Sequence, residues 1–324
     1  MTEKSIWVFL ERKGGDVEDT SLEILGKARE LSDRSGMQVT GILPGIIEDG
    51  KLKKIIHYGA DKLLNLMDDN LNTYSTDLYV HSLQNIVKER MPEILLIGAT
   101  PYGRDLAGRL AAKLKTGLTA NAVTLDVDDN GILISGVPAY GGKIIAEIVC
   151  EKSRPQMATV RPGTFRPYFN ENRNGEIIAV ESNTSGITNR VVVKERKISE
   201  FLDLTKSKRT VIAGNGTRGD LKLVREFADY IGADIGVTRP LADRGLISRD
   251  FQVGSTGYSL RSEIAVILGV SGSEHFTSGI KDCRTVISID MNPKAEIFQH
   301  SDYCIVGDIF DLIPKAIERM KVKM

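Results

Sequence analysis

Residues 252–276, QVGSTGYSLRSEIAVILGVSGSEHF, hold two glycine and hydroxyl turns, at 254–257 and 269–273, on either side of an apolar run at 264–268. The run is short, rich in isoleucine and valine, and ends at glycine, so we predict a buried strand. A glycine and serine turn after a buried strand presents backbone N–H groups and hydroxyls to an anionic ligand. Taken alone, these residues fit a phosphate-bearing cofactor site and two tight loops of an α/β sheet equally well.

The composition of the chain limits the classes of function. Its 324 residues are enough for two domains. Lysine plus arginine (43) balances aspartate plus glutamate (43), which argues against a nucleic-acid partner or an acidic membrane surface. The first apolar run is shorter than a signal-peptide core, and no later run has the length of a membrane span. We therefore expect a cytoplasmic protein without a membrane span.

The three cysteines, Cys150, Cys283 and Cys304, lie far apart in the sequence. They form no CxxC pair and no metal-ligand spacing, so we predict neither a metal site nor an iron–sulfur centre in this chain. Free thiols are typical of a reducing compartment, which agrees with a cytoplasmic location.

The N-terminal half alternates between strand and helix patterns. Strands are predicted at 5–10, 39–43, 60–66 and 93–98, and helices at 18–35 and 77–90, with Gly36 as the C-cap of the first helix. Further strands are predicted at 118–128, 131–137 and 143–150. This alternation indicates right-handed crossovers and a mostly parallel sheet. A helix predicted to begin near Arg104 follows a glycine turn, and Arg104 is either an anion ligand or a surface charge. We find no catalytic motif in this half.

A polar stretch at 169–190 and a charged stretch at 194–208 separate the two halves. We predict the domain boundary there, with an N-terminal α/β domain at 1–193 and a second domain at 194–324. The charged stretch fits a linker and an exchanged strand equally well.

The C-terminal half places polar residues at the ends of successive strands. A strand at 210–213, a glycine-rich turn at 214–219 and a helix at 220–231 form a nucleotide-binding arrangement, although the spacing is not GxGxxG. Arg239 follows another strand and either neutralises a cofactor's charge or pairs with Asp243. Asp290 and Asp308 end two more strands, where acids bind ribose hydroxyls. Because ligands of parallel sheets bind at the carboxyl ends of strands, we expect a long ligand such as FAD or NAD.

Several separated motifs, in the same order, resemble the alpha subunit of the electron transfer flavoprotein family. The resemblance covers the chain end to end. The motifs that carry it are GATPYGRDLAGRLAAKLKTGLTAN (98–121), SRPQMATVRPG (153–163), Thr238-Arg239, QVGSTG (252–257), GVSGSEHF (269–276), NPKAEIFQHSDY (292–303) and VGDIF (306–310).

This resemblance implies an α/β protein of two domains. The first is a Rossmann-like sheet of the nucleotide-hydrolase type that contacts a beta subunit, and the second is a parallel-sheet FAD-binding domain. The protein is then the alpha subunit of a heterodimer that shuttles electrons between flavoprotein dehydrogenases, of the acyl-CoA dehydrogenase type, and another redox partner. It implies an electron carrier rather than an enzyme with a substrate of its own.

The resemblance also assigns cofactor contacts. Arg239 lies over the flavin and stabilises its reduced, anionic form, and Thr256 hydrogen-bonds near flavin N5. The turn at 271–276 holds the pyrophosphate, and Asp290 and Asp308 face the adenosine. The full set of predicted FAD-binding residues is Arg218, Thr238, Arg239, Gln252, Val253, Gly254, Ser255, Thr256, Gly257, Ser271, Gly272, Ser273, Glu274, His275, Phe276, Asp290, Asp308 and Ile309.

The sequence departs from the family pattern in three places. The family has Gln-His where this chain has His275-Phe276, and it has Asn at the position of Asp290. The family's Gly-Gly-Arg-Gly loop is replaced here by residues 214–219, in which Arg218 is the substitute for the loop arginine. These departures leave two alternatives open. One is a stand-alone NAD- or FAD-dependent oxidoreductase, with His275 as its base; the other is an interaction subunit that has lost FAD.

Overall fold

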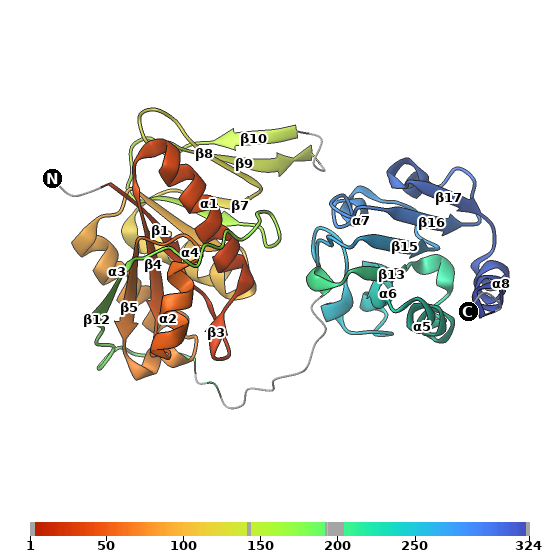
Figure 1. Ribbon diagram of the computed structural model, residues 1–324, viewed down its shortest axis with the longest axis horizontal. Helices are drawn as coiled ribbons and strands as arrows, with labels where there is room; N and C mark the ends of the chain where they lie inside the picture. Colours follow the sequence, from red (N-terminus) through yellow and green to blue (C-terminus); the bar gives the residue numbers. More distant parts are fainter. Residues whose placement is uncertain (1–3, 141–143, 192, 194–203, 322–324) are drawn as a thin grey trace. The chain divides into compact units, whose positions relative to one another are not determined.

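The computed structural model describes residues 4–140, 144–191, 193 and 204–321 (Figure 1). The chain forms two compact units, Met1–Arg196 and Lys197–Met324. The boundary predicted between 193 and 194 borders a stretch, 194–203, that lies outside the described residues, so its position stays a prediction. Each unit is built on a parallel sheet, which confirms the predicted α/β fold class.

The N-terminal unit holds a sheet of seven parallel strands with β1 near its centre. All five residues of β1 are buried, because helices cover both faces of the sheet. Ile6 and Val8 pack into one core with helix α1, and Trp7 and Phe9 pack into the other with α3 and α4. In sheet order the strands are β12 (Glu176–Glu181), β5 (Lys62–Met67), β4 (Gln38–Pro44), β1 (Ser5–Phe9), β6 (Ile94–Gly98), β11 (Gln156–Val160) and β7 (Leu118–Ala122).

Four helices flank this sheet: α1 (Asp19–Ser35), α2 (Asp49–Ile56), α3 (Thr76–Arg90) and α4 (Pro101–Leu114). Helix α1 ends at Gly36, which has φ 72° and donates its N–H to the Ser32 carbonyl, so the predicted C-cap is confirmed. Helix α4 begins earlier than predicted because Thr100 caps it: its Oγ1 accepts the Gly103 N–H at 2.9 Å. The described part of the chain contains no helix that is both long and apolar enough to cross a membrane.

The single strand predicted over 118–128 is wrong. The chain forms β7 and then β8 (Thr124–Val127), which belongs to a separate antiparallel sheet with β9 (Leu133–Ala139) and β10 (Ile144–Ile148). Asn121 has φ 61°, and the Val123 N–H donates to the Gly136 carbonyl at 2.8 Å, so the backbone leaves the parallel sheet there. A short hairpin, β2 (Arg12–Lys13) and β3 (Asp16–Val17), completes the strands among the described residues of this unit.

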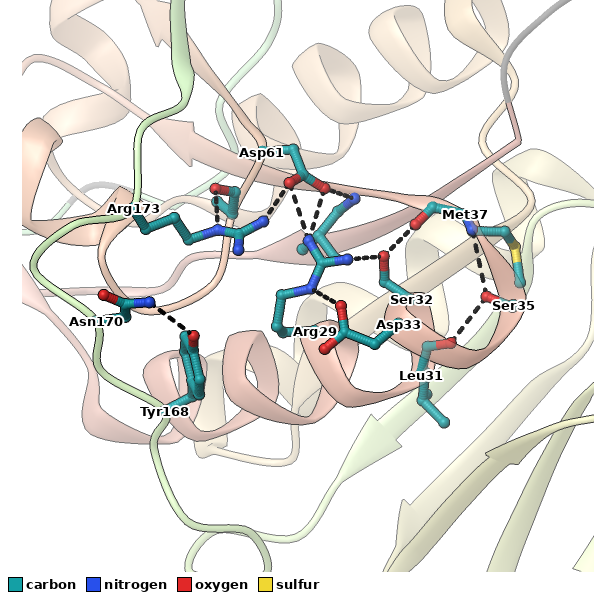
Figure 2. A network of polar contacts seen from close by, with 12 residues as sticks. Arg29, Leu31, Ser32, Asp33, Ser35, Met37, Asp61, Tyr168, Asn170 and Arg173 are labelled. Carbon is teal, nitrogen blue, oxygen red and sulfur yellow. Dashed lines mark hydrogen bonds and ion pairs between the residues drawn. The ribbon is translucent and has the colours of Figure 1, made fainter.

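A long return segment carries the chain from β11 to β12 at the far edge of the sheet (Figure 1). It passes close over α1 at Gly26, where a Cβ atom would lie 2.7 Å from the Tyr168 amide nitrogen. Its end is fixed by Asp61, whose carboxylate accepts hydrogen bonds from both Arg29 (2.9 and 3.0 Å) and Arg173 (Figure 2). This network therefore joins α1, the start of β5 and the return segment.

The C-terminal unit holds five parallel strands, in the order β14 (Asp234–Val237), β13 (Arg209–Ala213), β15 (Ile264–Leu268), β16 (Val286–Asp290) and β17 (Tyr303–Val306). The predicted strand at 264–268 is β15, the central strand, and four of its five residues are buried. Its side chains alternate between two cores. The α-helices described in this unit are α5 (Leu221–Ile231), α6 (Arg239–Asp243), α7 (Glu274–Thr277) and α8 (Ile309–Lys321). Among the described residues of both units, the 3-10 helices are η1 (Asp69–Asn72), η3 (Leu204–Lys206), η4 (Asn215–Thr217), η5 (Arg249–Phe251) and η6 (Glu296–His300).

A buried carboxyl group, that of Glu11, lies just beyond the end of β1. Its side chain is 8% exposed, and the Thr100 hydroxyl donates to its Oε2 atom. Burial raises the pKa of Glu11 to about 7, and the Thr100 hydrogen bond only partly opposes that rise. The folded protein therefore holds a proton on Glu11 at pH values where an unfolded chain has released it.

Ionisation of Glu11 predicts a pH-dependent stability of the N-terminal unit. Since the folded pKa is raised, the free energy of unfolding should fall as the pH rises from about 4.5 to about 7, by on the order of 3 kcal/mol in total. Glu11→Gln should remove this dependence, while Glu30→Gln, at an exposed site, should keep it. Denaturant unfolding at pH 5 and pH 8, followed by fluorescence of the buried Trp7, measures the effect. An equal pH dependence in Glu11→Gln and the unmutated protein would contradict it.

Candidate functional site

A cavity of about 710 Å³ opens at the carboxyl ends of the strands of the C-terminal unit. Its volume lies in the range of ~300–1,000 Å³ that is typical of small-molecule sites. The wall is built from the loops that follow β13, β14, β15 and β16, which is where open parallel sheets bind ligands. The lining residues are Asn215, Gly216, Thr238, Arg239, Pro240, Gln252, Val253, Gly254, Ser255, Thr256, Gly269, Val270, Ser271, Ser273, His275, Phe276, Asp290, Asn292, Lys294, Ala295 and Glu296.

The turn at 252–257 is held by its own hydrogen bonds. Gln252 is 5% exposed, and its Nε2 donates to the Thr256 Oγ1 at 2.7 Å. The Gly257 N–H donates to the Gly254 carbonyl at 3.0 Å, which closes the turn. Because the Thr256 hydroxyl accepts a hydrogen bond from Gln252, its own hydrogen is available to donate into the cavity. The buried Gln252 thus orients the Thr256 hydroxyl as a hydrogen-bond donor to the cavity.

Two loops far apart in the sequence, the turn at 252–257 and helix α7, are locked together. The Ser255 N–H donates to the His275 carbonyl at 2.7 Å, and the Ser255 Oγ lies 3.2 Å from the His275 Nδ1. Gly254 makes the approach possible: it has φ 131°, and a Cβ there would lie 2.6 Å from the His275 carbonyl oxygen. The two ends of the 252–276 stretch therefore form one wall of the cavity.

The consecutive residues His275 and Phe276 have different environments. The His275 side chain is exposed at the cavity, with its Nδ1 beside the Ser255 hydroxyl. Phe276 is 5% exposed and packs into the core with Ile280 and Val253, so it contributes only apolar surface to the wall. Of these two residues, His275 alone brings a hydrogen-bonding side chain to the cavity, one position earlier than the family pattern.

The second glycine turn, 269–273, packs against the loop after β16. The Ile297 N–H donates to the Ser271 carbonyl at 3.1 Å. Gly272 has φ 96°, and a Cβ there would lie 2.1 Å from the Ile297 amide nitrogen, so only glycine allows this contact. Ser273 then precedes the four-residue helix α7 as its N-cap residue. The turn predicted to bind phosphate is consequently built jointly with residues of the next strand-end loop.

Arg239 lies at the cavity and also pairs with Asp243, while its predicted charge neutralisation of a cofactor stays a prediction. It lines the cavity directly after Thr238, whose backbone N–H donates to the Ala213 carbonyl at 3.0 Å. Its Nε also donates to the Asp243 Oδ2 at 3.2 Å. A cavity position and an ion pair with Asp243 therefore coexist.

Six of the predicted residues do not line the cavity in this structure: Arg218, Gly257, Gly272, Glu274, Asp308 and Ile309. The Arg218 guanidinium lies over the Phe310 ring, 5.2 Å from its centroid. Asp308 accepts the Phe310 N–H at 2.9 Å at the start of α8, and Ile309 is buried at 4% exposure. Their assignment to the cofactor stays a prediction.

Some lining residues were missed by the sequence reasoning, above all those of the loop after Asp290. Asn292 folds this loop, because its Oδ1 accepts the Lys294 N–H at 3.0 Å, and Lys294 is exposed at the cavity. Pro240, Ala295 and Glu296 were also missed. Asn215, Gly216, Gly269 and Val270 were not predicted individually as contacts, although they lie in the turns 214–219 and 269–273 that the sequence indicated as ligand-binding. All of them follow directly on strands, so the strand-end rule, applied to whole loops, would have included them.

Comparison with known proteins assigns this architecture to a family. Residues 6–185 match the family described as "Electron transfer flavoprotein domain", and residues 203–281 match "Electron transfer flavoprotein FAD-binding domain". The electron transfer flavoprotein subunit alpha of Thermoanaerobacterium thermosaccharolyticum is 38% identical over 98% of each chain. That of Clostridium acetobutylicum is 36% identical over 98% of this chain and 97% of its own.

A third relative carries a more specific name. It is the lactate dehydrogenase (NAD(+),ferredoxin) subunit LctC of Acetobacterium woodii, which is 31% identical over 97% of this chain and 76% of its own. The matches at the family level cover both units, and the cavity lies in the unit that matches the FAD-binding domain. This chain belongs to the electron transfer flavoprotein family as an alpha subunit, and its cofactor is FAD.

Proposed function

We propose that the chain holds FAD in the cavity at the strand ends of its C-terminal unit and forms a heterodimer with an electron transfer flavoprotein beta subunit. The complex passes electrons, in the cytoplasm, between a flavoprotein dehydrogenase of the acyl-CoA dehydrogenase type and another redox protein. The observation that carries this proposal is the cavity itself, which lies in the unit that matches the FAD-binding domain and collects the loops of four adjacent strands.

The residues of the cavity wall fit the chemistry of FAD. Hydroxyl groups come from Thr238, Ser255, Thr256, Ser271 and Ser273, and cationic side chains come from Arg239 and Lys294. Hydroxyls and cations are the donors that a pyrophosphate and the polar edge of a flavin require. The same cavity argues against an interaction subunit that has lost FAD, since the turns that form it are intact and hydrogen-bonded.

The flavin of FAD supplies the redox chemistry, since it accepts and releases electrons when bound. Arg239 contributes a permanent positive charge at the cavity, and such a charge favours the more negative, reduced state of a nearby cofactor. Thr256 donates a hydrogen bond that Gln252 orients, and the Ser255 hydroxyl fixes the orientation of the His275 ring. This arrangement binds and tunes a cofactor. The alternative in which His275 serves as the base of an NAD-type enzyme stays a prediction, because a contact at Nδ1 does not prevent base catalysis at Nε2.

The beta subunit is proposed to cover strand β10 of the N-terminal unit. This strand lies at the edge of its sheet, and residues on both of its faces are exposed. Ile144 (55% exposed) and Ile148 (41% exposed) project to one face, and Ile145 (46% exposed) projects to the other. Exposed apolar edge strands promote association unless they are covered, so a partner surface accounts for this composition.

Exchange of the cavity arginine should lower the flavin potential. Arg239→Lys should retain FAD but lower its midpoint potential, because a compact ammonium cannot reproduce the planar charge of guanidinium. Each tenfold loss in the affinity for reduced relative to oxidised FAD lowers the potential by ~60 mV for one electron. Spectroelectrochemical titration of the complex, with reduction by an acyl-CoA dehydrogenase measured in parallel, tests both the role of Arg239 and the proposed electron donor. Arg225→Lys, on helix α5 away from the cavity wall, is the control. An unchanged potential in Arg239→Lys would contradict the assignment.

The glycine contact behind the second turn should be essential for FAD binding. Gly272→Ala places a Cβ against the Ile297 backbone, which must move the 269–273 turn, so we expect FAD affinity to fall at least about tenfold. Gly245→Ala, at φ 70° with no atom within 4 Å of the new Cβ, carries the same kind of backbone strain without the clash. Titration of apoprotein with FAD compares the two variants. Equal losses of affinity would show that backbone strain, and not the Ile297 contact, is responsible.

A charge on strand β10 should prevent assembly. Ile148→Glu places a carboxylate on a face that we expect to be buried against the beta subunit, and an unpaired buried charge is strongly unfavourable. Glu147→Gln, on the opposite face of the same strand, serves as the control. Co-expression with the beta subunit followed by size-exclusion chromatography should give heterodimer for Glu147→Gln and separated subunits for Ile148→Glu. Heterodimer at normal yield in Ile148→Glu would place the interface elsewhere.

A further inference from the structure

The carboxylate of Asp243 pairs with two arginines at once, at the rim of the cavity. Its Oδ2 accepts from the Arg239 Nε at 3.2 Å, and its Oδ1 accepts from the Arg249 Nη2 at 2.8 Å. Of the three, only Arg239 lines the cavity. Asp243 thus stands between the cavity arginine and a second arginine.

This ion-pair group joins two elements that shape the same wall. Arg239 and Asp243 are the first and last residues of α6, four positions apart and therefore neighbours on one side of that helix. Arg249 begins η5, which leads directly into the turn that starts at Gln252. The backbone reinforces the connection, because the Val253 N–H donates to the Val237 carbonyl at 2.9 Å.

The Arg239 side chain is so exposed that its position depends on a hydrogen-bond partner. The Arg239 side chain is 64% exposed, and among the described residues only Asp243 accepts a hydrogen bond from it. Without that partner a long, solvated side chain would sample many rotamers. With Nε held by Asp243, the plane of the guanidinium is constrained and both Nη groups stay available to a ligand.

We infer that Asp243 is a positioning residue for the FAD site: it holds the Arg239 guanidinium at the cavity wall, and Arg249 holds Asp243 in turn. This inference rests on the proposed role of Arg239 toward the reduced flavin. The group of two cations and one anion keeps a net positive charge at the wall, so the carboxylate fixes the arginine without cancelling the local charge.

The direction in which the flavin midpoint potential shifts when Asp243 is replaced distinguishes a positioning role of Asp243 from a purely electrostatic one. If Asp243 acted only as a nearby negative charge, its removal would raise the flavin potential, since the reduced state would lose a repulsive neighbour. If Asp243 positions Arg239, truncation releases the arginine and lowers the potential. Asp243→Asn keeps an oxygen that can accept from the Arg239 Nε while losing the charge, so its potential should equal or exceed that of the unmutated protein.

The experiment is spectroelectrochemical titration of the FAD-loaded complex of the full chain with its beta subunit. Asp243→Ala is expected to lower the affinity for reduced relative to oxidised FAD by about fivefold, the scale of one exposed charge-network interaction. The matched charge control is Asp250→Ala, at an exposed aspartate that follows Arg249 in the sequence and accepts from the Ser248 hydroxyl; this variant should not lower it. In the Arg239→Lys background, Asp243→Ala should cause no further decrease.

The outcomes separate this inference from the proposed function. A raised or unchanged potential in Asp243→Ala, together with a lowered one in Arg239→Lys, would overturn the positioning role alone. An unchanged potential in Arg239→Lys would overturn the role of Arg239 on which the inference rests. Asp243→Ser provides a second truncation if Asp243→Ala does not fold, and the same signs apply to it. Equal decreases in Asp243→Ala and Asp250→Ala would also overturn the inference, because the effect would then not depend on contact with Arg239.

Discussion

The contact between the turn at 252–257 and helix α7 is the constraint on which the cavity of the C-terminal unit depends. One backbone hydrogen bond, from Ser255 to the His275 carbonyl at 2.7 Å, joins two loops that flank the central strand β15. The contact exists only because residue 254 has no side chain beyond hydrogen, since a Cβ would lie 2.6 Å from the same carbonyl oxygen. A parallel sheet brings strand ends together, and glycine lets their loops touch.

Two further backbone contacts between loops shape the neighbouring parts of the cavity. Gly272 lets the turn after β15 contact Ile297, which brings the loop containing Lys294 to the wall. On the other side, Val237 and Val253 pair through their backbones, so Arg239 is placed beside the turn that presents Thr256. Backbone contacts between loops thus set the positions of the side chains that line the cavity. Rigid support of this kind is what a cofactor-tuning site requires, because electrostatic effects fall off over a few ångströms.

The sequence predicted the central features for clear physical reasons. A short apolar run that is rich in isoleucine and valine and ends at glycine predicts a buried strand, and β15 has the predicted bounds of 264–268. Local patterns likewise predicted Gly36 as a helix C-cap and placed Arg239 at the end of a strand. The break between β7 and β8 was not, because it depends on a hydrogen bond from Val123 to Gly136, which the local pattern does not encode. Similarly, the packing of Arg218 on Phe310 joins residues far apart in the chain, so no local sequence motif predicts it.

The central claim is that FAD occupies the cavity formed by the two turns of residues 252–276. Hydrogen–deuterium exchange of the apoprotein and the FAD-loaded protein tests it most directly, since it reports on backbone N–H groups of each loop separately. We predict one FAD per chain and slower exchange on binding in the segments 252–257 and 271–276. Stoichiometric FAD binding with no change of exchange in either segment would contradict the account.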